Sequence, residues 1–528
     1  MAPDEPPIRC VHHKGVVRQM KILSRSVRRA VLVGAAALLL TASACSDPDS
    51  DSGSESAASI TIGMQAPINS FDPADLLEGQ QAYVWSALYD TLLHIDNDGK
   101  LQPNAAESWK YSDDARTLTL KLRDKMTFSS GDTVTAAAVK ATLEHTIASA
   151  GSQRGNLEAV TAVEAPDERT VVLSLSRPDS SLLISLSQGA GVIGDPKTLN
   201  TPRTTLDPVG SGPYVLDRKA TVNGSRYVLQ RRDDYWNADA YPFRTLTVRV
   251  IADRTALFNA LLSGELDAGT VDASQARAVK GAGRQLKRVE GVAIATLDLN
   301  DRAGTLAKPL GDVRVRRAIN MAFDRSKIVE KIIGGLGQPT TQIFTPQSPA
   351  FDPALDKKYP YDPAAARKLL AEAGYAAGFS LTIPATVVSQ ILQPTITQSL
   401  GDIGITVNWK PVPPQDSGQT KEYAVYFNMA GTTPTPRTIT LKLAPDGSKN
   451  PFKYKTPELA ALIDKASTVT DPEQAAGIYQ QINAYVVDDA WFAPIFSISA
   501  NWVTKSGIEY LGNGAGLLSS VRTFGVTG

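Results

Sequence analysis

A short apolar run near the start of the chain separates the first 44 residues from the part that can build a core. Ala30 to Leu40 reads AVLVGAAALLL, which is too short to cross a bilayer, because a spanning helix needs about 20 apolar residues. The run is preceded by the basic residues Lys21, Arg25, Arg28 and Arg29. A positive segment, a short apolar core and small residues predict a signal peptide over residues 1–44.

Cys45 follows the small residues Thr41 to Ala44, so this segment resembles the lipobox of bacterial lipoproteins, with Ala42 where leucine is usual. The resemblance implies that Cys45 is lipidated and becomes the mature N-terminus. Simple secretion by cleavage after Ala44 is the alternative. Residues 45–58 are rich in Ser and Asp and predict a flexible tether. We also expect translation to start at Met20.

Loss of the first 44 residues changes what the composition implies. The full chain of 528 residues has 54 basic and 54 acidic side chains, and this segment carries seven of the basic and two of the acidic ones. The mature chain then has a net charge of −5, which argues against nucleic acid as a partner. Its single Cys excludes an internal disulfide, and its two His residues, His94 and His145, make a zinc centre improbable. We expect no cofactor and no metal site.

Strand-like alternation and helix-like periodicity mix along the whole mature chain, which predicts the α/β class. The expected strands are 59–64, 118–122, 171–175, 226–231, 245–250, 379–384, 406–410 and 423–427. The expected helices are 80–93, 135–148, 255–262, a basic amphipathic helix within 313–333, 363–373, 458–467 and 472–487. We interpret the basic cluster Arg314, Arg316 and Arg317 as a solvated helix face, and Tyr83 and Trp85 as core residues.

Five ordered blocks carry a resemblance to a known family. They are AESW at 106–109 with RTLTLKLR at 116–123 and FSSGD at 128–132, VGSGPY at 209–214, DYW at 234–236, LN at 299–300 with DVRVRRAI at 312–319, and YDP at 361–363 with AGY at 373–375. In this order they are similar to the extracellular solute-binding proteins, family 5, which are oligopeptide-, dipeptide- and nickel-type receptors of ABC importers. In VGSGPY we expect Gly210 and Gly212 to allow positive φ or a close backbone approach.

The resemblance implies a two-lobed periplasmic-binding-protein fold (type II) with an extra subdomain inserted in the first lobe. Lobe I would contain residues 59–85, 206–288 and 496–528, the inserted subdomain residues 86–205, and lobe II residues 289–495. The chain would cross between lobes near 289–291 and 493–495. Ligand would bind both lobes only in the closed form, and the importer would recognise that form.

The resemblance also suggests where ligand binds. Peptide-binding members carry Trp, and shortly afterwards an Asp that pairs with the peptide's α-ammonium group, on a lobe II segment that corresponds to residues 426–433. Here Asn428 and Gly431 stand in those places. The expected ligand-binding residues are Asn69, Phe71, Asn428, Met429, Gly431, Thr432 and Arg437. Arg437 could take a carboxylate bidentately, or it could equally be a surface residue. A pocket lined by neutral groups would suit a capped or cyclic peptide, a sugar-like solute or a metal chelate.

No catalytic motif is present in the mature sequence, and His145 is expected on a helix surface or half-buried. We therefore predict a monomeric, non-enzymatic, lipid-anchored receptor at the outer face of the cytoplasmic membrane, at the cell surface or in the periplasm. Its partners would be a peptide or peptide-like solute and the ABC permease and ATPase subunits. A receptor for a metal chelate or oligosaccharide, and a surface lipoprotein with a sensing or chaperone role, remain alternatives. An exported hydrolase is poorly supported.

Overall fold

The computed structural model describes residues 59–469, 472–514 and 519–527. The predicted signal peptide, Cys45 and the predicted tether lie outside these residues. Within the described part, no helix is long and apolar enough to cross a membrane.

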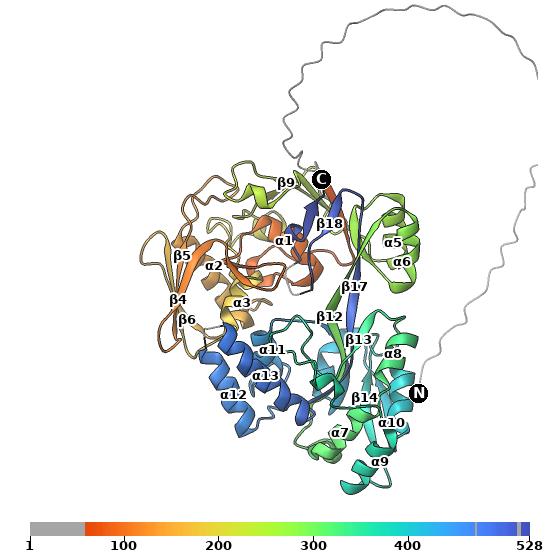
Figure 1. Ribbon diagram of the computed structural model, residues 1–528. Coiled ribbons are helices and arrows are strands. Elements are labelled where there is room, and N and C mark those ends of the chain that lie inside the picture. Colours follow the sequence, from red (N-terminus) through yellow and green to blue (C-terminus); the bar gives the residue numbers. More distant parts are fainter. Residues whose placement is uncertain (1–58, 470–471, 515–518, 528) are drawn as a thin grey trace, which may run out of the picture. The chain divides into compact units, whose positions relative to one another are not determined.

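The largest sheet of the described residues is mixed and has nine strands (Figure 1). Its strands are, in order across the sheet, β16 (Val425–Gly431), β12 (Gln285–Leu299), β17 (Phe492–Thr504), β11 (Ala268–Val271), β1 (Ser59–Met64), β10 (Thr245–Val250), β9 (Arg226–Arg231) and β8 (Tyr214–Leu216), with β13 (Gly337–Pro339) also paired to β17. β1 is parallel to β10 and β11, and the other pairs are antiparallel. The α/β class is confirmed.

Two long strands connect the two ends of this sheet. β12 and β17 pair from Gln285↔Thr504 to Asp298↔Phe492, with an irregular register between Val289 and Ala293. One end of β17 pairs with β11, while the far end of β12 pairs with β16. Figure 1 shows the two strands running side by side between the elements around α1 and those around α7. The predicted crossings at 289–291 and 493–495 fall inside these strands.

The remaining strands form small sheets. A four-stranded antiparallel sheet has the order β4 (Ala106–Tyr111), β5 (Thr117–Leu122), β7 (Thr170–Leu175) and β6 (Val160–Glu164). Three two-stranded sheets pair β2 (Leu93–Ile95) with β3 (Leu101–Pro103), β14 (Phe379–Ala385) with β15 (Ile405–Pro411), and β18 (Ile508–Tyr510) with β19 (Phe524–Val526).

The helices of the described residues pack around these sheets. They are α1 (Ala82–Leu88), α2 (Ala136–Ala148), α3 (Leu182–Leu186), α4 (Pro202–Leu206), α5 (Arg254–Ser263), α6 (Ala276–Gly281), α7 (Val313–Met321), α8 (Arg325–Lys331), α9 (Pro363–Glu372), α10 (Gln393–Gly401), α11 (Thr435–Lys442), α12 (Pro457–Thr468) and α13 (Pro472–Asp488). Gly264 ends α5 with φ 87°, the left-handed conformation that favours glycine.

Buried apolar residues form several separate cores, each under its own set of strands and helices. One core is built on β1, β9, β10 and α1, and includes the predicted core residues Tyr83 and Trp85, which are 2% and 1% exposed. A second core draws its buried residues from 92–209, around the four-stranded sheet. On the β16 side of the large sheet, one core lies under α7, α9 and α10 and another under α11, α12 and α13. The lobe boundaries remain a prediction.

The helix expected over 80–93 ends at Leu88, because close backbone packing occupies the next positions. The amide of Gly212 donates to the carbonyl of Leu88 at 3.0 Å. A Cβ atom at Gly210 would lie 1.9 Å from that same oxygen. The close backbone approach expected for Gly210 and Gly212 is therefore confirmed, and these glycines serve packing.

The interpretation of the arginine cluster as a solvated face is wrong for Arg316. Its side chain is 2% exposed, forms an ion pair with Asp489 at 2.9 Å and donates to the carbonyl of Leu310 at 2.8 Å. Arg314 pairs with Asp312 at the start of α7, as a surface residue would. Helical periodicity turns successive residues to different faces, so one arginine of the three enters the core where backbone carbonyls satisfy it.

Candidate ligand-binding site

The segment expected to bind ligand is mostly β16, whose side chains alternate between two faces. Phe427 is buried in the core under α7, α9 and α10, and Met429 packs against the same core. Asn428 faces the other side, where its Nδ2 donates to Oδ2 of Asp298 at 3.2 Å. The structure therefore separates two predicted neighbours: Asn428 lies on the α11 face of the sheet and Met429 does not.

β16 lies at one edge of the large sheet, so it pairs with β12 on one side and with no strand of the sheet on the other. The amide of Thr432 donates to the carbonyl of Val292 at 3.1 Å, which places residues 428, 430 and 432 in the hydrogen-bonded positions facing β12. The N–H and C=O groups of Met429 and Gly431 consequently point away from β12. Gly431 is exposed, and a Cβ atom there would meet nothing closer than the Val292 carbonyl oxygen at 3.7 Å.

Arg437, on α11, contacts a segment that is distant from it in sequence. Its Nη1 donates to Oγ of Ser185 on α3 at 3.4 Å. Burial lowers the pKa of Arg437, whereas the nearby carboxylates of Glu78 and Asp179 raise it. An ion pair also joins these two segments, Arg177 to Asp446 at 3.8 Å. The loop and helix at 177–185 thus lie against the start of α11 and the loop after it.

Glu78 supplies the negative charge that faces Arg437. Its Oε1 accepts hydrogen bonds from the amide of Gly189 at 3.2 Å and from Nε2 of Gln153 at 3.4 Å. Burial of the carboxylate raises the pKa of Glu78, while the Gly189 amide and Arg437 lower it. No ion pair closer than 4 Å links Glu78 to Arg437 in the described residues, so the two groups face each other without direct contact.

The surroundings of Asn428 are charged, whereas the sequence led us to expect neutral groups. Asp298 is 2% exposed, and its Oδ1 has no hydrogen-bond partner. Lys442, at the end of α11, places its Nζ 5.3 Å from the ring of Phe492, which pairs with Asp298 across the ladder. Burial lowers the pKa of Lys449, the nearby Lys442 and Arg437 lower it further, and Asp298 raises it.

The two predicted residues of the first loop have different environments. Phe71 is 2% exposed and packs edge-to-face on Tyr227, with ring centroids 6.1 Å apart, so it belongs to the core. Asn69 is exposed, and its Nδ2 donates to the carbonyl of Asp75 at 3.0 Å. Neither residue contacts Asn428 or Arg437 through a hydrogen bond that the structure shows. We leave Phe71 out of the candidate site.

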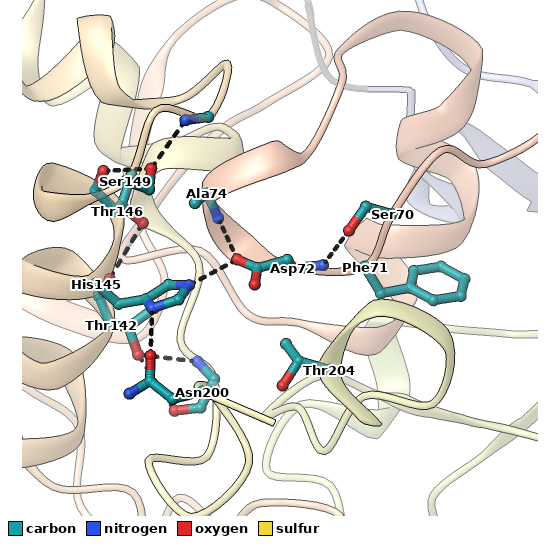
Figure 2. A network of polar contacts seen from close by, with 12 residues as sticks. Ser70, Phe71, Asp72, Ala74, Thr142, His145, Thr146, Ser149, Asn200 and Thr204 are labelled. Carbon is teal, nitrogen blue, oxygen red and sulfur yellow. Dashed lines mark hydrogen bonds and ion pairs between the residues drawn. The ribbon is translucent and has the colours of Figure 1, made fainter. Parts of the chain in front are cut away.

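A histidine fixes this loop to α2 (Figure 2). Nε2 of His145 lies 2.8 Å from Oδ1 of Asp72, and Nδ1 lies 3.1 Å from Oδ1 of Asn200. The same Asp72 oxygen accepts from the amide of Ala74 at 2.9 Å. His145 is half-buried, as expected, but its pairing with Asp72 was not predicted. The described residues hold no cluster of His, Cys, Asp and Glu that could bind a metal ion.

Glu78, Asp298, Lys442 and Lys449 were missed by sequence reasoning. Glu78 and Lys449 are single charges in polar stretches and carry no local signal. Asp298 had one: it is the charged residue of an otherwise uncharged strand sequence, Ala295-Thr296-Leu297-Asp298-Leu299. A carboxylate inside a strand that the core surrounds needs an explanation, since burial of an unpaired charge is costly.

Comparisons with known proteins agree with this architecture. The model of the bacterial extracellular solute-binding proteins, family 5, matches residues 100–450. The glutathione-binding protein GsiB of Escherichia coli K12 is 30% identical over 410 residues, which cover 75% of this chain and 76% of that protein. The Shigella dysenteriae GsiB is 30% identical over 408 residues, with coverage of 75% and 76%.

Solved structures show the same fold. The binding protein AgaA from A. tumefaciens, in complex with agropinic acid, superposes with a TM-score of 0.73 at 26% identity, covering 89% of this chain and 99% of AgaA. The unliganded, open murein tripeptide-binding protein MppA gives a TM-score of 0.74 at 20% identity, covering 89% and 97%. The chain therefore belongs to the bacterial extracellular solute-binding proteins of family 5 and has their two-lobed fold.

Proposed function

We propose that this protein is the substrate-binding component of an ABC importer, and that it captures a peptide-like solute at the open edge of β16. Membership of family 5 supports the transport role. The relatives that are named as glutathione-binding proteins support a short peptide-like ligand. Binding requires no chemistry, and we assign no catalytic residue.

The observation that carries this proposal is the outward-facing main chain of Met429 and Gly431. An extended peptide can add to an exposed sheet edge as a further strand, and its main-chain hydrogen bonds then supply affinity without dependence on sequence. Gly431 leaves side-chain room at this edge. Asn428, Thr432 and Arg437 surround the same end of β16 and would contact the ligand's side groups.

Gly431 also bears on the kind of peptide. Family members that bind free peptides place an aspartate there, whose carboxylate pairs with the α-ammonium group. Gly431 cannot do so. We therefore expect preference for ligands in which the peptide amine is blocked, or in which the α-ammonium group lies off the peptide main chain, as the γ-glutamyl bond of glutathione places it.

Closure on the ligand would use the predicted lobes, residues 59–85, 206–288 and 496–528 against residues 289–495, with 86–205 inserted. The contacts of Arg437 with Ser185 and of Arg177 with Asp446 are consistent with segments that meet when the cleft closes. The irregular register after Val289, where Gly291 has φ 68°, suits a hinge in β12.

The test is a thermal-shift screen of the exported form, from Cys45 onward, against three tripeptide sets: free, N-acetylated and glutathione-like. Ligand that binds the folded state raises the melting temperature. We expect the acetylated or glutathione-like sets to raise it and free peptides to do so weakly. Gly431→Asp should reverse that preference, since a side chain fits there. The proposal fails if no set stabilises the protein.

Export and anchoring through Cys45 complete the proposal. The family is extracellular, and the lipobox-like segment 41–45 favours lipid attachment over simple secretion. Metabolic labelling with an alkyne fatty acid should mark the wild-type protein, and Cys45→Ser should abolish labelling and release the protein from the membrane fraction. A Cys45→Ser protein that stays in that fraction would contradict anchoring at Cys45.

A further inference from the structure

Three cationic side chains lie on α11 and on the loop that follows it. Arg437 and Lys442 lie on the helix, and the amide of Lys449 donates to the carbonyl of Leu441 at 2.9 Å, which brings the following loop back to the helix end. Lys442 and Arg437 both lie close enough to Lys449 to depress the pKa of its ammonium group. Within residues 59–469, none of the three has a carboxylate within ion-pair distance.

Asp298 lies on the sheet face beneath these cations. The carboxylate is 2% exposed, and Asn428 donates to its Oδ2 while its Oδ1 has no partner. Tyr426 lies directly across the ladder from Asp298, and the burial of its phenol together with this carboxylate raises the pKa of Tyr426. A buried oxygen without a donor is rare in folded proteins and indicates an internal water or a group that binds there.

This arrangement is electrostatically incomplete. Lys449, with Lys442 beside it, faces the single carboxylate of Asp298, whereas Arg437 faces Glu78 and Asp179, and like charges that lie close together repel. A ligand carboxylate would neutralise the excess through charge-assisted hydrogen bonds, which are the stronger class of hydrogen bond. An N–H group on the same ligand would satisfy Oδ1 of Asp298. The competing explanation for that oxygen is a water shared with Arg302, whose buried Nε also lacks a partner.

We propose that the α11 charge cluster, defined as Arg437, Lys442, Lys449 and Asp298, binds the charged end of the ligand. The three cations hold a carboxylate, and Asp298 accepts a hydrogen bond from an N–H of the same molecule. The solute is thus an anionic peptide-like molecule. This inference rests on the proposed function, which places a peptide-like ligand on the adjacent strand β16.

The test uses titration calorimetry to compare acids with counterparts whose carboxylates are neutralised as esters or amides. The probes are glutathione and its diethyl ester, and N-acetyl-trialanine as free acid and as amide. At least one acid should bind, about tenfold or more tighter than its neutral counterpart, and its affinity should fall as the ionic strength rises. Equal affinity of acids and neutral counterparts would overturn the inference and leave the proposed function intact. If no probe binds, both fail.

Variants locate the carboxylate site. Lys449→Gln should lower the affinity for the acid about tenfold, because a charge-assisted hydrogen bond is lost, and should leave the neutral probe unchanged. Arg437→Gln and Lys442→Gln should act in the same direction. The matched control is Lys110→Gln, an exposed lysine on β4 remote in sequence from α11. A Lys449→Gln protein that binds the acid as the control does would contradict this assignment.

Asp298→Ala and Asp298→Asn together test the second half of the inference. Both remove the charge, but only Asp298→Ala removes the acceptor for the ligand N–H, so the acid should bind Asp298→Ala about tenfold more weakly than Asp298→Asn. Circular dichroism before each titration checks that the variants are folded. Equal affinity of the two folded variants would show that the free oxygen of Asp298 serves an internal water.

Discussion

Two buried aspartates in this protein have different surroundings. Asp90, in the first core, has a donor on each oxygen: Oδ1 accepts from the Tyr235 hydroxyl at 2.6 Å, and Oδ2 from Nε1 of Trp236 at 3.4 Å. Asp298, beside β16, has a donor on Oδ2 and none on Oδ1. Both residues are 2% exposed. The difference indicates that the fold itself supplies donors to both oxygens of Asp90 but leaves Oδ1 of Asp298 without one.

The regions around Asp90 and Asp298 also differ in the space around their glycines. Gly210 lies against the Leu88 carbonyl with no room for a Cβ atom, whereas Gly431 has room for one. The carboxylate of Asp90 and the backbone at Gly210 therefore find their partners within the fold, although the buried Nε of Arg522 near Asp90 has none. The region around β16 and α11 has unpaired main-chain groups, an unpartnered oxygen and uncompensated charge. A binding site must keep such groups available, because ligand supplies their partners.

Alanine at the two glycines should give the largest difference. Gly210→Ala is expected to lower the free energy of unfolding by about 4 kcal/mol or more, because the 1.9 Å approach to a backbone oxygen forces the chain apart. Gly431→Ala should change it by less than about 0.5 kcal/mol. Urea denaturation followed by circular dichroism measures both, and equal stability losses would remove the contrast.

Alanine at the two aspartates comes next. Asp90→Ala leaves the donors of Tyr235 and Trp236 buried without an acceptor, and should cost about 3 kcal/mol of unfolding free energy. Asp298→Ala removes a carboxylate that is only half satisfied, and should cost about 1 kcal/mol. Denaturation of the two variants under the same conditions tests this order. A larger loss for Asp298→Ala would identify it as a structural residue.

The pH dependence of the free energy of unfolding tests the surroundings of Asp90. Burial raises the pKa of Asp90 from 3.8 to about 6, so the folded state retains a proton that the unfolded state has released, and stability falls as the pH rises from about 4 to 6. Burial lowers the pKa of His94 from 6.5 to about 4, so the unfolded state binds the proton, and stability rises over nearly the same interval. Each shift corresponds to roughly 3 kcal/mol.

Because the two effects oppose each other, the wild-type protein should show little net change from these groups between pH 4 and 6. His94→Gln should unmask the Asp90 effect, with stability falling by up to roughly 3 kcal/mol over that range. Urea midpoints measured at several pH values test this. A variant that follows the wild-type profile would mean that His94 titrates alike in both states.

The smallest effect concerns the charge cluster without ligand. Lys449→Gln should raise the free energy of unfolding by about 0.5 kcal/mol or less, because it relieves repulsion from Lys442 and Arg437 at a position that water screens. The same variant should bind acidic probes less well. Thermal melts without ligand test the gain, with Lys110→Gln as the control. A loss of stability would mean that Lys449 supports the fold.

Much of the fold followed from local pattern, and the failures have physical reasons. Strands 226–231 and 245–250 were predicted with their observed bounds, because alternation and flanking turns mark them. The long strands β12 and β17 were missed. β17 begins as Phe492-Ala493-Pro494-Ile495-Phe496, buried on both faces, so it has no alternation, and its proline is atypical of strands.

The candidate site residues that the sequence analysis named came only from the family resemblance. Asn428, Gly431 and Arg437 lie together near the end of β16 and the start of α11. The opposite placement of Met429 could have been foreseen, since neighbouring strand residues face opposite sides. Glu78 could not, because it approaches Arg437 only through segments far apart in sequence. Asp298 carried a local signal, but its contact with Asn428, 130 residues away, could not be foreseen.

Hydrogen exchange tests the location of the site most directly. With the tightest-binding probe at saturation, exchange measured by mass spectrometry should slow in peptides covering residues 425–432, because the free amides of Met429 and Gly431 gain acceptors. Peptides covering β9, at 226–231, should be unchanged. Saturating ligand that leaves exchange at 425–432 unaltered would contradict binding at the edge of β16.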